Sequence, residues 1–344
     1  MDNFTIDIIV PVWNRPVETR DCLVTLMDQS PGARFILVDN GSDRETERIL
    51  QEFAELLDNR ALLLRNDVNQ GYVRAVNRGL ARAEAPLAAV VRNTSQVSPG
   101  WLEPLLRCVA ECPQAGIVVP TIVEAADRKG AAGGKADHSR RETSCGSLAA
   151  MVIRKALYDA AGGLDEELDG GMWCLKDFSQ RAREHGFLTL AVPASLVAAR
   201  EEPQLGSAER RSETLRLSAE RYRERWGEGR AFCIVFPAGV SRPVWEEKKG
   251  ALLAGARCGH IFTVLAESHL YRELCQTGED HLHDGIVLRR IPRLFKERWV
   301  ARTLEGLREG RGDTTAVCGV DGIPFPGGEP AISFADLARI VDPR

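Results

Sequence analysis

Polar residues stand at the ends of two apolar runs in the first hundred residues, where they could meet a ligand. Asp39 and Asn40 follow one run (ILV), and Asn93 and Thr94 follow another (LAAVVR). If both runs are strands of one parallel sheet, their carboxyl ends lie at the same edge, where α/β proteins bind ligands. Carboxylate, amide and hydroxyl groups there can exchange hydrogen bonds with a polar ligand.

The elements that must position these residues alternate along the chain. Strand-like runs lie at 6–11, 34–38, 61–65, 87–92 and 116–119, and helix-like segments lie at 17–29, 43–57, 70–83 and 99–111. Strands that recur with helices between them imply parallel βαβ units with right-handed crossovers. The pattern continues with a run at 148–153, a helix at 155–161, a polar helix at 177–185 and a strand at 187–192.

A composition change near Gly227 divides the chain into two predicted domains, 1–228 and 229–344. Residues 200–229 are strongly charged and predict a surface helix followed by the boundary. Beyond it, strands are predicted at 231–236, 260–265, 285–290 and 314–319, and helices at 243–257, 293–309 and 333–341. We therefore expect a smaller carboxyl-terminal α/β domain.

Composition limits the classes of function. The 344 residues are 44% hydrophobic and 27% charged, as in ordinary globular proteins, and the net charge of −4 gives no reason to expect nucleic acid as a partner. No apolar run approaches the length that spans a bilayer, and the first residues do not resemble a secretion signal, so cytoplasmic residence is the expectation. Nine scattered cysteines without a CxxC pair predict no disulfide framework and no structural metal site.

Seven motifs together resemble family 2 glycosyltransferases, which have the GT-A fold. In chain order they are IIVPVWNRP (8–16), ILVDNGSD (36–43), NQGYVRAVNRGL (69–80), VSPGWLEPLL (97–106), MVIRKALYDAAGGLDEEL (151–168), DFSQRAREHGF (177–187) and YRERWG (222–227). The resemblance covers residues 1 to about 227. It implies a Rossmann-like, mostly parallel sheet with helices on both faces, whereas the carboxyl-terminal domain resembles no family that we can name.

The resemblance assigns nucleotide binding to the first strand and the VDNGSD turn. By position, Pro11, Val12 and Trp13 would line the base pocket, and Asp39 would accept hydrogen bonds from the base or ribose. The alternative is that Asp39 belongs to a turn followed by a helix cap at Ser42 or Asp43.

The segment NQGYVRAVNRGL packs beside the nucleotide in relatives. Asn69 and Gly71 begin it, and Gly71 would permit close approach of the backbone. Arg74 and Arg78 lie four residues apart, hence on one helix face, and could reach a diphosphate. The alternative is a solvated helix face.

The metal-binding motif of the family is altered. Relatives carry an acid where this chain has Thr94, within Arg92-Asn93-Thr94. A divalent cation that bridges a diphosphate requires anionic oxygen ligands, so the substitution argues against an Mg²⁺ or Mn²⁺ cofactor. Arg92 could partly replace the metal as a fixed positive charge.

The acidic pair that supplies the catalytic base is altered as well. Relatives carry an ED-x-D run at the start of the helix that begins near Asp177. Aligned without gaps, these four positions hold Cys174, Leu175, Lys176 and Asp177 here. Only the last acid remains, so Asp177 is the first choice for the base. The alternative is a helix N-terminal acid that only favours the helix dipole.

Other acids lie in the loop before that helix. Asp165 and Glu166 match the family's GGxDE, which orients the acceptor side, and they, Glu167 or Asp169 could substitute as the base. Trp173 is expected either to stack on a sugar ring or to anchor the core.

The resemblance implies a glycosyltransferase that moves a sugar from a nucleoside-diphosphate sugar to a hydroxyl of a glycan, lipid-linked or protein acceptor, as in polysaccharide biosynthesis. The two altered motifs support a rival: a catalytically silent GT-A module that binds a nucleotide, a glycan or a partner enzyme. In that case the carboxyl-terminal domain would be the docking element for a protein partner.

Overall fold

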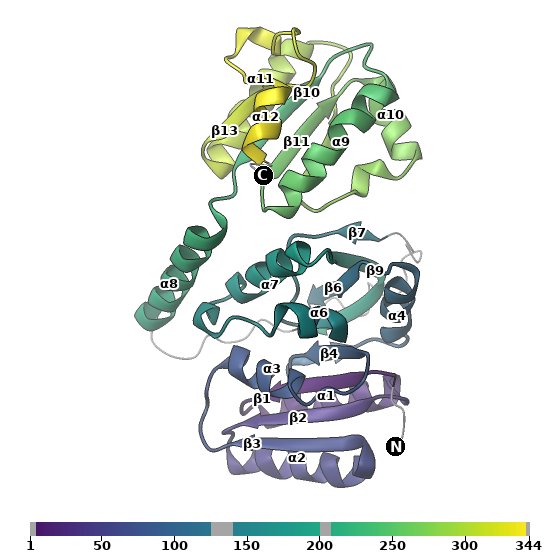
Figure 1. Ribbon diagram of the computed structural model, residues 1–344, viewed down its shortest axis with the longest axis vertical. Helices are drawn as coiled ribbons and strands as arrows, with labels where there is room; N and C mark the ends of the chain where they lie inside the picture. The colour runs from purple at the N-terminus through teal and green to yellow at the C-terminus, as the bar shows by residue number, and fades with distance from the viewer. Residues whose placement is uncertain (1–4, 125–139, 200–207, 342–344) are drawn as a thin grey trace. The chain divides into compact units, whose positions relative to one another are not determined.

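The structure is a computed structural model that describes residues 5–124, 140–199 and 208–341. The chain forms two compact units (Figure 1). The first comprises residues 1–140 and 145–225, and the second comprises residues 141–144, which include the short strand β7 (Arg141–Glu142), and residues 226–344.

One mixed sheet forms the centre of the first unit. Its strands follow the order β3-β2-β1-β4-β8-β6-β9-β5. They are β1 (Asp7–Val12), β2 (Arg34–Asn40), β3 (Ala61–Asn66), β4 (Leu87–Val91), β5 (Ser95–Val97), β6 (Ala115–Glu124), β8 (Ala150–Arg154) and β9 (Leu188–Ala199). Strands β1 to β4 are parallel, as the alternation of strands and helices predicts.

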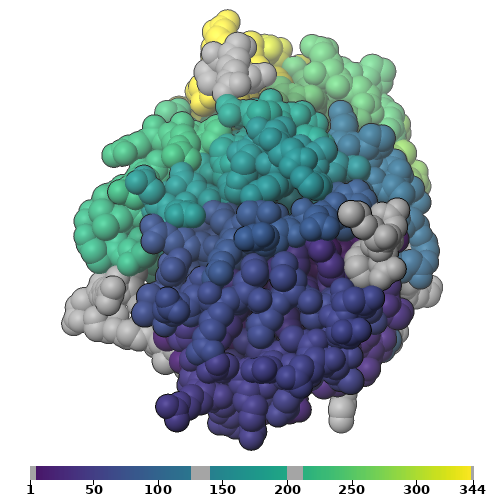
Figure 2. All heavy atoms as spheres, turned by 60° about the horizontal axis from the view of Figure 1, so that its bottom comes forward, coloured from purple at the N-terminus to yellow at the C-terminus, as the bar shows by residue number. Residues whose placement is uncertain are grey.

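Helices cover both faces of this sheet because successive strand residues point to opposite sides. From β1, Ile8 and Val10 join one apolar cluster with α1 (Pro16–Gln29), α2 (Arg44–Leu57) and α4 (Leu102–Glu111). Ile9 joins the other cluster, with α3 (Tyr72–Leu80), α6 (Lys155–Ala161) and α7 (Trp173–Glu184). The long helix α8 (Ala208–Trp226) follows β9. Figure 2 shows one side of this unit, in purple and blue, as a continuous packed surface.

Two features of the sheet differ from the expectation of a simple βαβ series. Strand β8 is antiparallel to both neighbours, β4 and β6. Strand β9 continues past Pro193 to Ala199, and its far end pairs with β5, which no sequence pattern predicted. The apolar alternation of β9 is interrupted at Pro193, which explains why the sequence indicated only its first half.

The second unit has a smaller, wholly parallel sheet. Its order is β12-β11-β10-β13, formed by β10 (Ala231–Phe236), β11 (Ile261–Ala266), β12 (Ile286–Arg290) and β13 (Thr314–Cys318). One face packs against α9 (Arg242–Arg257), α10 (Ser268–Gln276) and α12 (Phe334–Val341), and the other against α11 (Lys296–Arg311). This unit is the small α/β domain that the sequence predicts, with α10 as an additional helix.

Short 3₁₀ helices at Asp58–Arg60, Glu166–Leu168, Glu279–His281 and Pro326–Gly328 complete the described elements. Over the described ranges, no helix combines the length and apolar character needed to cross a bilayer.

Packing of α3 on the sheet depends on a glycine. Gly79 is buried against β1 and β2, where an added Cβ would overlap the Cγ2 methyl of Ile9 and crowd that of Val38. We expect Gly79→Ala to destabilise the first unit by about 1–3 kcal/mol through overpacking, despite the better helix propensity of alanine. The measurement is urea unfolding, with the first unit followed by amide hydrogen exchange in β1 and β2.

Gly250 provides the matched control, since it is exposed within α9 and a Cβ there would meet nothing. Gly250→Ala is expected to be neutral or stabilising by up to about 1 kcal/mol. Equal effects of the two substitutions would contradict the packing argument.

Candidate functional site

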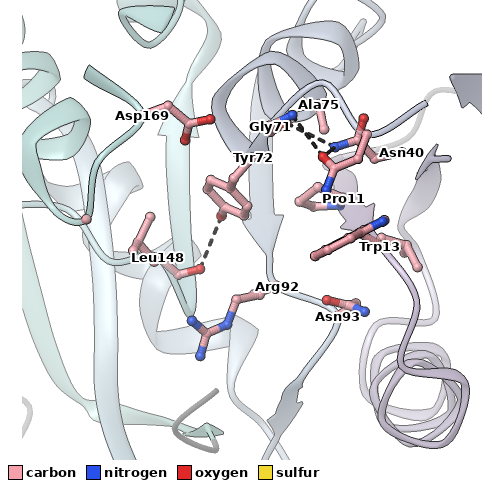
Figure 3. A pocket seen from close by; sticks show the side chains of 13 residues that line it. Pro11, Trp13, Asn40, Gly71, Tyr72, Ala75, Arg92, Asn93, Leu148 and Asp169 are labelled. Atoms are coloured by element: carbon pink, nitrogen blue, oxygen red, sulfur yellow. Dashed lines mark hydrogen bonds between the residues drawn. The ribbon is translucent and has the colours of Figure 1, made fainter. Parts of the chain in front are cut away.

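A cavity of about 280 Å³ opens at the carboxyl ends of β1, β2 and β4 in the first unit (Figure 3). These strand ends, the start of α3 and two connecting segments supply its lining residues: Pro11, Val12, Trp13, Asn40, Asn69, Gly71, Tyr72, Ala75, Arg92, Asn93, Leu148, Asp169 and Gly171. The cavity therefore lies where the strand-end argument predicts a ligand.

Asn40 organises one wall of the cavity. Its Nδ2 donates to Asn69 Oδ1 at 2.8 Å and to the carbonyl of Gly71 at 3.0 Å. Its Oδ1 accepts from Asn66 Nδ2 at 2.8 Å and from the Gln70 N–H at 3.1 Å. A side chain with two donors and an acceptor oxygen is needed for this pattern, and it ties the end of β2 to the loop before α3.

Trp13 stands at the mouth of the cavity with 38% of its surface exposed. The next two residues, Asn14 and Arg15, both have positive φ, which is strained for residues other than glycine. Asn14 is held there because its N–H donates to Ser42 Oγ at 3.0 Å and its Oδ1 accepts from the Asp43 N–H at 2.8 Å. The bend keeps the indole at the cavity instead of in the core.

Asp169 faces the start of α3 across the cavity from Trp13, as Figure 3 shows. Its Oδ1 accepts from the Val73 N–H at 3.3 Å. Gly71 has φ +96, and an added Cβ there would collide with Asp169 Oδ2, so only glycine permits this approach. Burial raises the pKa of Asp169 to about 6, against smaller opposing effects of the Val73 and Tyr72 N–H groups.

The end of β4 brings a cation into the cavity and no carboxylate. Arg92 and Asn93 line it, and Asn93 Nδ2 donates to Thr19 Oγ1 at 2.9 Å and to the Asn14 carbonyl at 3.3 Å. Thr94 is buried and is not among the lining residues. A guanidinium cannot bind a cation, and the neutral amide and hydroxyl oxygens of Asn93 and Thr94 are weaker ligands for Mg²⁺ or Mn²⁺ than carboxylate oxygens.

The same conclusion holds for the cavity as a whole. Asp169 is the one carboxylate among its described lining residues, and the described part of the chain contains no cluster of three or more His, Cys, Asp or Glu side chains able to hold a metal ion.

The structure brings together about half of the residues that the sequence singles out. Those that line the cavity are Pro11, Val12, Trp13, Asn40, Asn69, Gly71, Arg92, Asn93 and Asp169. Those that do not are Asp39, Arg74, Arg78, Thr94, Asp165, Glu166, Glu167, Trp173 and Asp177. Their functional roles remain predictions.

Arg74 and Arg78 line a separate open depression on α3, together with Glu166. Arg74 Nε forms an ion pair with Glu166 Oε2 at 2.9 Å. Arg78 donates to the Arg65 carbonyl at 2.7 Å and to Asn66 Oδ1. Neither guanidinium points to the cavity at the strand ends.

Asp177 is fully buried and carries two ion pairs. Its Oδ2 meets Arg181 Nε at 2.8 Å and its Oδ1 meets Arg225 Nη1 at 2.7 Å. Arg225 Nη1 also lies 2.8 Å from Asp165 Oδ2. Both oxygens of Asp177 are thus engaged, which is the environment of a structural carboxylate and not of a proton acceptor open to substrate.

Asp39 and Trp173 also have protein partners. Asp39 is buried, and its Oδ1 accepts from the Ser42 N–H at 2.9 Å, which stabilises the turn before α2. Asp43 caps α2 by accepting from the Thr46 N–H. Trp173 packs against Tyr222, with ring centroids 5.2 Å apart, and under the Lys176 ammonium, 4.6 Å from the ring.

Comparison with known proteins shows what part of the chain is similar to. Residues 7–145 match the family model described as glycosyl transferase family 2. These residues are therefore similar in sequence to that family. Residues 146–344, which include most of the second unit, lie outside the match.

Two relatives are similar to short parts of this chain. Glycosyltransferase AglE of Haloferax volcanii is 29% identical over 101 residues, which are 28% of this chain and 33% of that protein. Polypeptide N-acetylgalactosaminyltransferase 4 of Caenorhabditis elegans is 33% identical over 101 residues, 28% of this chain and 16% of that protein. The chain therefore spans a third or less of the length of these relatives.

Among solved structures, GalNAc-T7 crystallised with UDP, GalNAc and Mn²⁺ superimposes with a TM-score of 0.51 at 15% identity. The match covers 65% of this chain and 50% of that one. It shows the GT-A fold, which confirms the fold class that the motifs imply.

The buried ion pairs of Asp177 predict a loss of stability when its charge is removed. Asp177→Asn leaves Arg181 and Arg225 without their shared counter-charge, so we expect a loss of about 3–5 kcal/mol in the free energy of unfolding. Urea denaturation measures it. Asp159→Asn, which removes an exposed partner of Lys155, should cost under about 1 kcal/mol. An Asp177→Asn protein of unchanged stability would contradict the structural role.

Proposed function

We propose that the first unit transfers a sugar from a nucleoside-diphosphate sugar to a hydroxyl of a glycan, lipid-linked or protein acceptor. The family match and the GT-A fold support sugar transfer in general, and the cavity residues supply the finer assignment. In it, Trp13 and Asn40 contact the nucleotide, Arg92 neutralises the diphosphate, and Asp169 is the base.

A single observation carries this proposal: a largely desolvated carboxylate, Asp169, lines a cavity whose described lining residues include no other acid. Asp169 lines the cavity, its pKa is raised to about 6 by burial, and Gly71 leaves room for it. A base with a pKa near the working pH is ionised at neutral pH yet still takes a proton readily. These properties favour an active enzyme over a silent binding module.

The chemistry assigned to the cavity is one displacement. The acceptor oxygen attacks the anomeric carbon while its proton passes to the Asp169 carboxylate. The bond from the anomeric carbon to the diphosphate oxygen breaks, and its electron pair leaves with the nucleoside diphosphate. Arg92 would stabilise the negative charge that develops on this leaving group, as fixed cations do for other phosphate leaving groups.

Asp169→Asn tests the base. The amide cannot accept the proton, so we expect kcat to fall by about 10²–10⁴-fold while nucleotide affinity is retained. A panel of UDP-, GDP- and dTDP-sugars is first screened by thermal shift, and release of nucleotide is then measured with glycan, lipid-linked and peptide acceptors. The matched control is Glu166→Gln, because Glu166 pairs with Arg74 outside the cavity.

The pH profile gives an independent test of the same residue. The wild-type kcat/KM should decrease as the pH falls through about 6, because protonated Asp169 cannot accept a proton. A full rate for Asp169→Asn, or nucleotide binding without any turnover by the wild type, would favour the silent module instead.

From the role proposed for Arg92, we predict that turnover does not depend on a divalent cation. We expect EDTA to leave the rate unchanged, since the donor groups beside Arg92 do not fit Mg²⁺ or Mn²⁺. Arg92→Gln should lower kcat by about 10²–10³-fold, and Arg92→Lys, which keeps the charge without the planar fork, should lose less. Strict activation by Mg²⁺ or Mn²⁺ would refute this assignment.

A further inference from the structure

Three arginines of the second unit gather at a cavity that the proposed sugar transfer does not use. The cavity has a volume of about 320 Å³, and its lining residues are Ser268, Arg272, Arg290 and Arg293. Ser268 and Arg272 belong to α10, which follows β11, Arg290 ends β12, and Arg293 lies in the connection to α11. The cavity is therefore at the carboxyl ends of two parallel strands, the edge where α/β units bind ligands.

The positive charge of this cavity is not neutralised by the described protein. Among the residues that the structure describes, none of these three guanidinium groups has a carboxylate partner, and Arg272 Nε donates instead to the Ser268 carbonyl at 3.1 Å. Glu267, the acid immediately before α10, is already paired with Lys296. Three like charges that converge without a counter-ion repel one another, so an anion bound between them is favoured.

Backbone N–H groups at the start of α10 add hydrogen-bond donors at the same end of the sheet. Helix α10 begins at Ser268, and the residue before it, Glu267, makes no side-chain hydrogen bond to the first turn. The first N–H groups of a helix have no partner within the helix and carry its positive dipole end. They reinforce the arginines in attracting an anion.

The number and type of donors select the anion. Guanidinium groups bind phosphate oxygens through paired hydrogen bonds, and several arginines can share the oxygens of one phosphate or diphosphate. We propose that this cavity binds the phosphate or diphosphate group of an organic phosphate. The ligand is either a soluble phosphate ester or the headgroup of an anionic lipid, which present the same chemistry to the arginines.

The two residues after Arg293 indicate which of the two ligands, a soluble phosphate ester or a lipid headgroup, this cavity binds. Leu294 is 74% exposed and Phe295 is 81% exposed, and Phe295 has φ 54, a costly conformation for an aromatic residue. Large apolar side chains held outward beside a phosphate site would contact the chain of a lipid, whereas a soluble ester has no need of them.

The test compares two double variants of the full chain with equal change in charge. Arg290→Gln with Arg293→Gln removes two cavity cations, and Arg302→Gln with Arg311→Gln removes two exposed cations of α11 outside the cavity. Calorimetric titration with inorganic pyrophosphate, and sedimentation with phosphatidic acid vesicles against phosphatidylcholine vesicles, measure binding. We expect the cavity variant to lose about tenfold or more in affinity and the control variant to match the wild type.

The outcomes separate the sources. Pyrophosphate binding without vesicle binding, lost in the cavity variant, supports the site with a soluble ester. A lipid ligand is supported by three results together. The wild type binds phosphatidic acid vesicles, and Arg290→Gln with Arg293→Gln abolishes this binding. Leu294→Ser with Phe295→Ser weakens vesicle binding without affecting pyrophosphate binding. No binding to either probe, or binding that both double variants keep or lose equally, overturns the proposal. Pyrophosphate bound at the Arg92 cavity of the first unit would remain in both double variants, so only the part lost in the cavity variant counts for this site.

Discussion

The buried charge of Asp177 is the constraint on which the amino-terminal site depends. A fully buried carboxylate must be compensated, and here Arg181 and Arg225 supply the compensation. Arg181 also donates to the carbonyl of Ala161 at the end of α6, at 2.6 Å, and to that of Gly163 after it, at 2.7 Å. Arg225 reaches Asp165. One ionic network thereby joins α7, α8 and the segment that leads to Asp169. The network anchors Asp165, four residues before the cavity carboxylate Asp169.

Asp169 and Asp177 have the same side chain but lie in different environments, which give them different properties. Asp177 is buried with two guanidinium groups and remains an ion-pair partner. Asp169 is partly buried, and the backbone N–H groups beside it offset less of the desolvation, so its pKa is raised to about 6. The first arrangement stabilises the fold, and the second leaves a group able to exchange a proton near neutral pH. Gly71 makes the second arrangement possible, because any side chain there would occupy the position of the Asp169 carboxylate.

Much of the fold and part of the site could be predicted from sequence because they follow local rules. Period-two and helical patterns predicted β1 to β4 and their helices, and the strand-end rule selected Asn40 and Asn93. The family resemblance added Trp13, Gly71 and Arg92. Asp169 was only one of several loop acids, since its approach to Gly71 joins residues far apart in the sequence. The spacing of Arg74 and Arg78 predicted their shared helix face but not the Glu166 that it meets. Helix α10 was missed because its nine residues bury only Leu270 and Leu274.

The altered motifs are consistent with one another when the charge of the cavity is considered as a whole. A metal-dependent site needs carboxylates to hold the cation, and the cation in turn offsets their repulsion for a diphosphate. Removing the cation while keeping those acids would leave the cavity too negative for its donor. Here Thr94 stands where the resemblance predicts an acid, Arg92 lines the cavity, and Asp169 is the one carboxylate among the described lining residues. In the proposed transfer these two features would act together, because the diphosphate would meet a guanidinium and the acceptor hydroxyl would meet a single base.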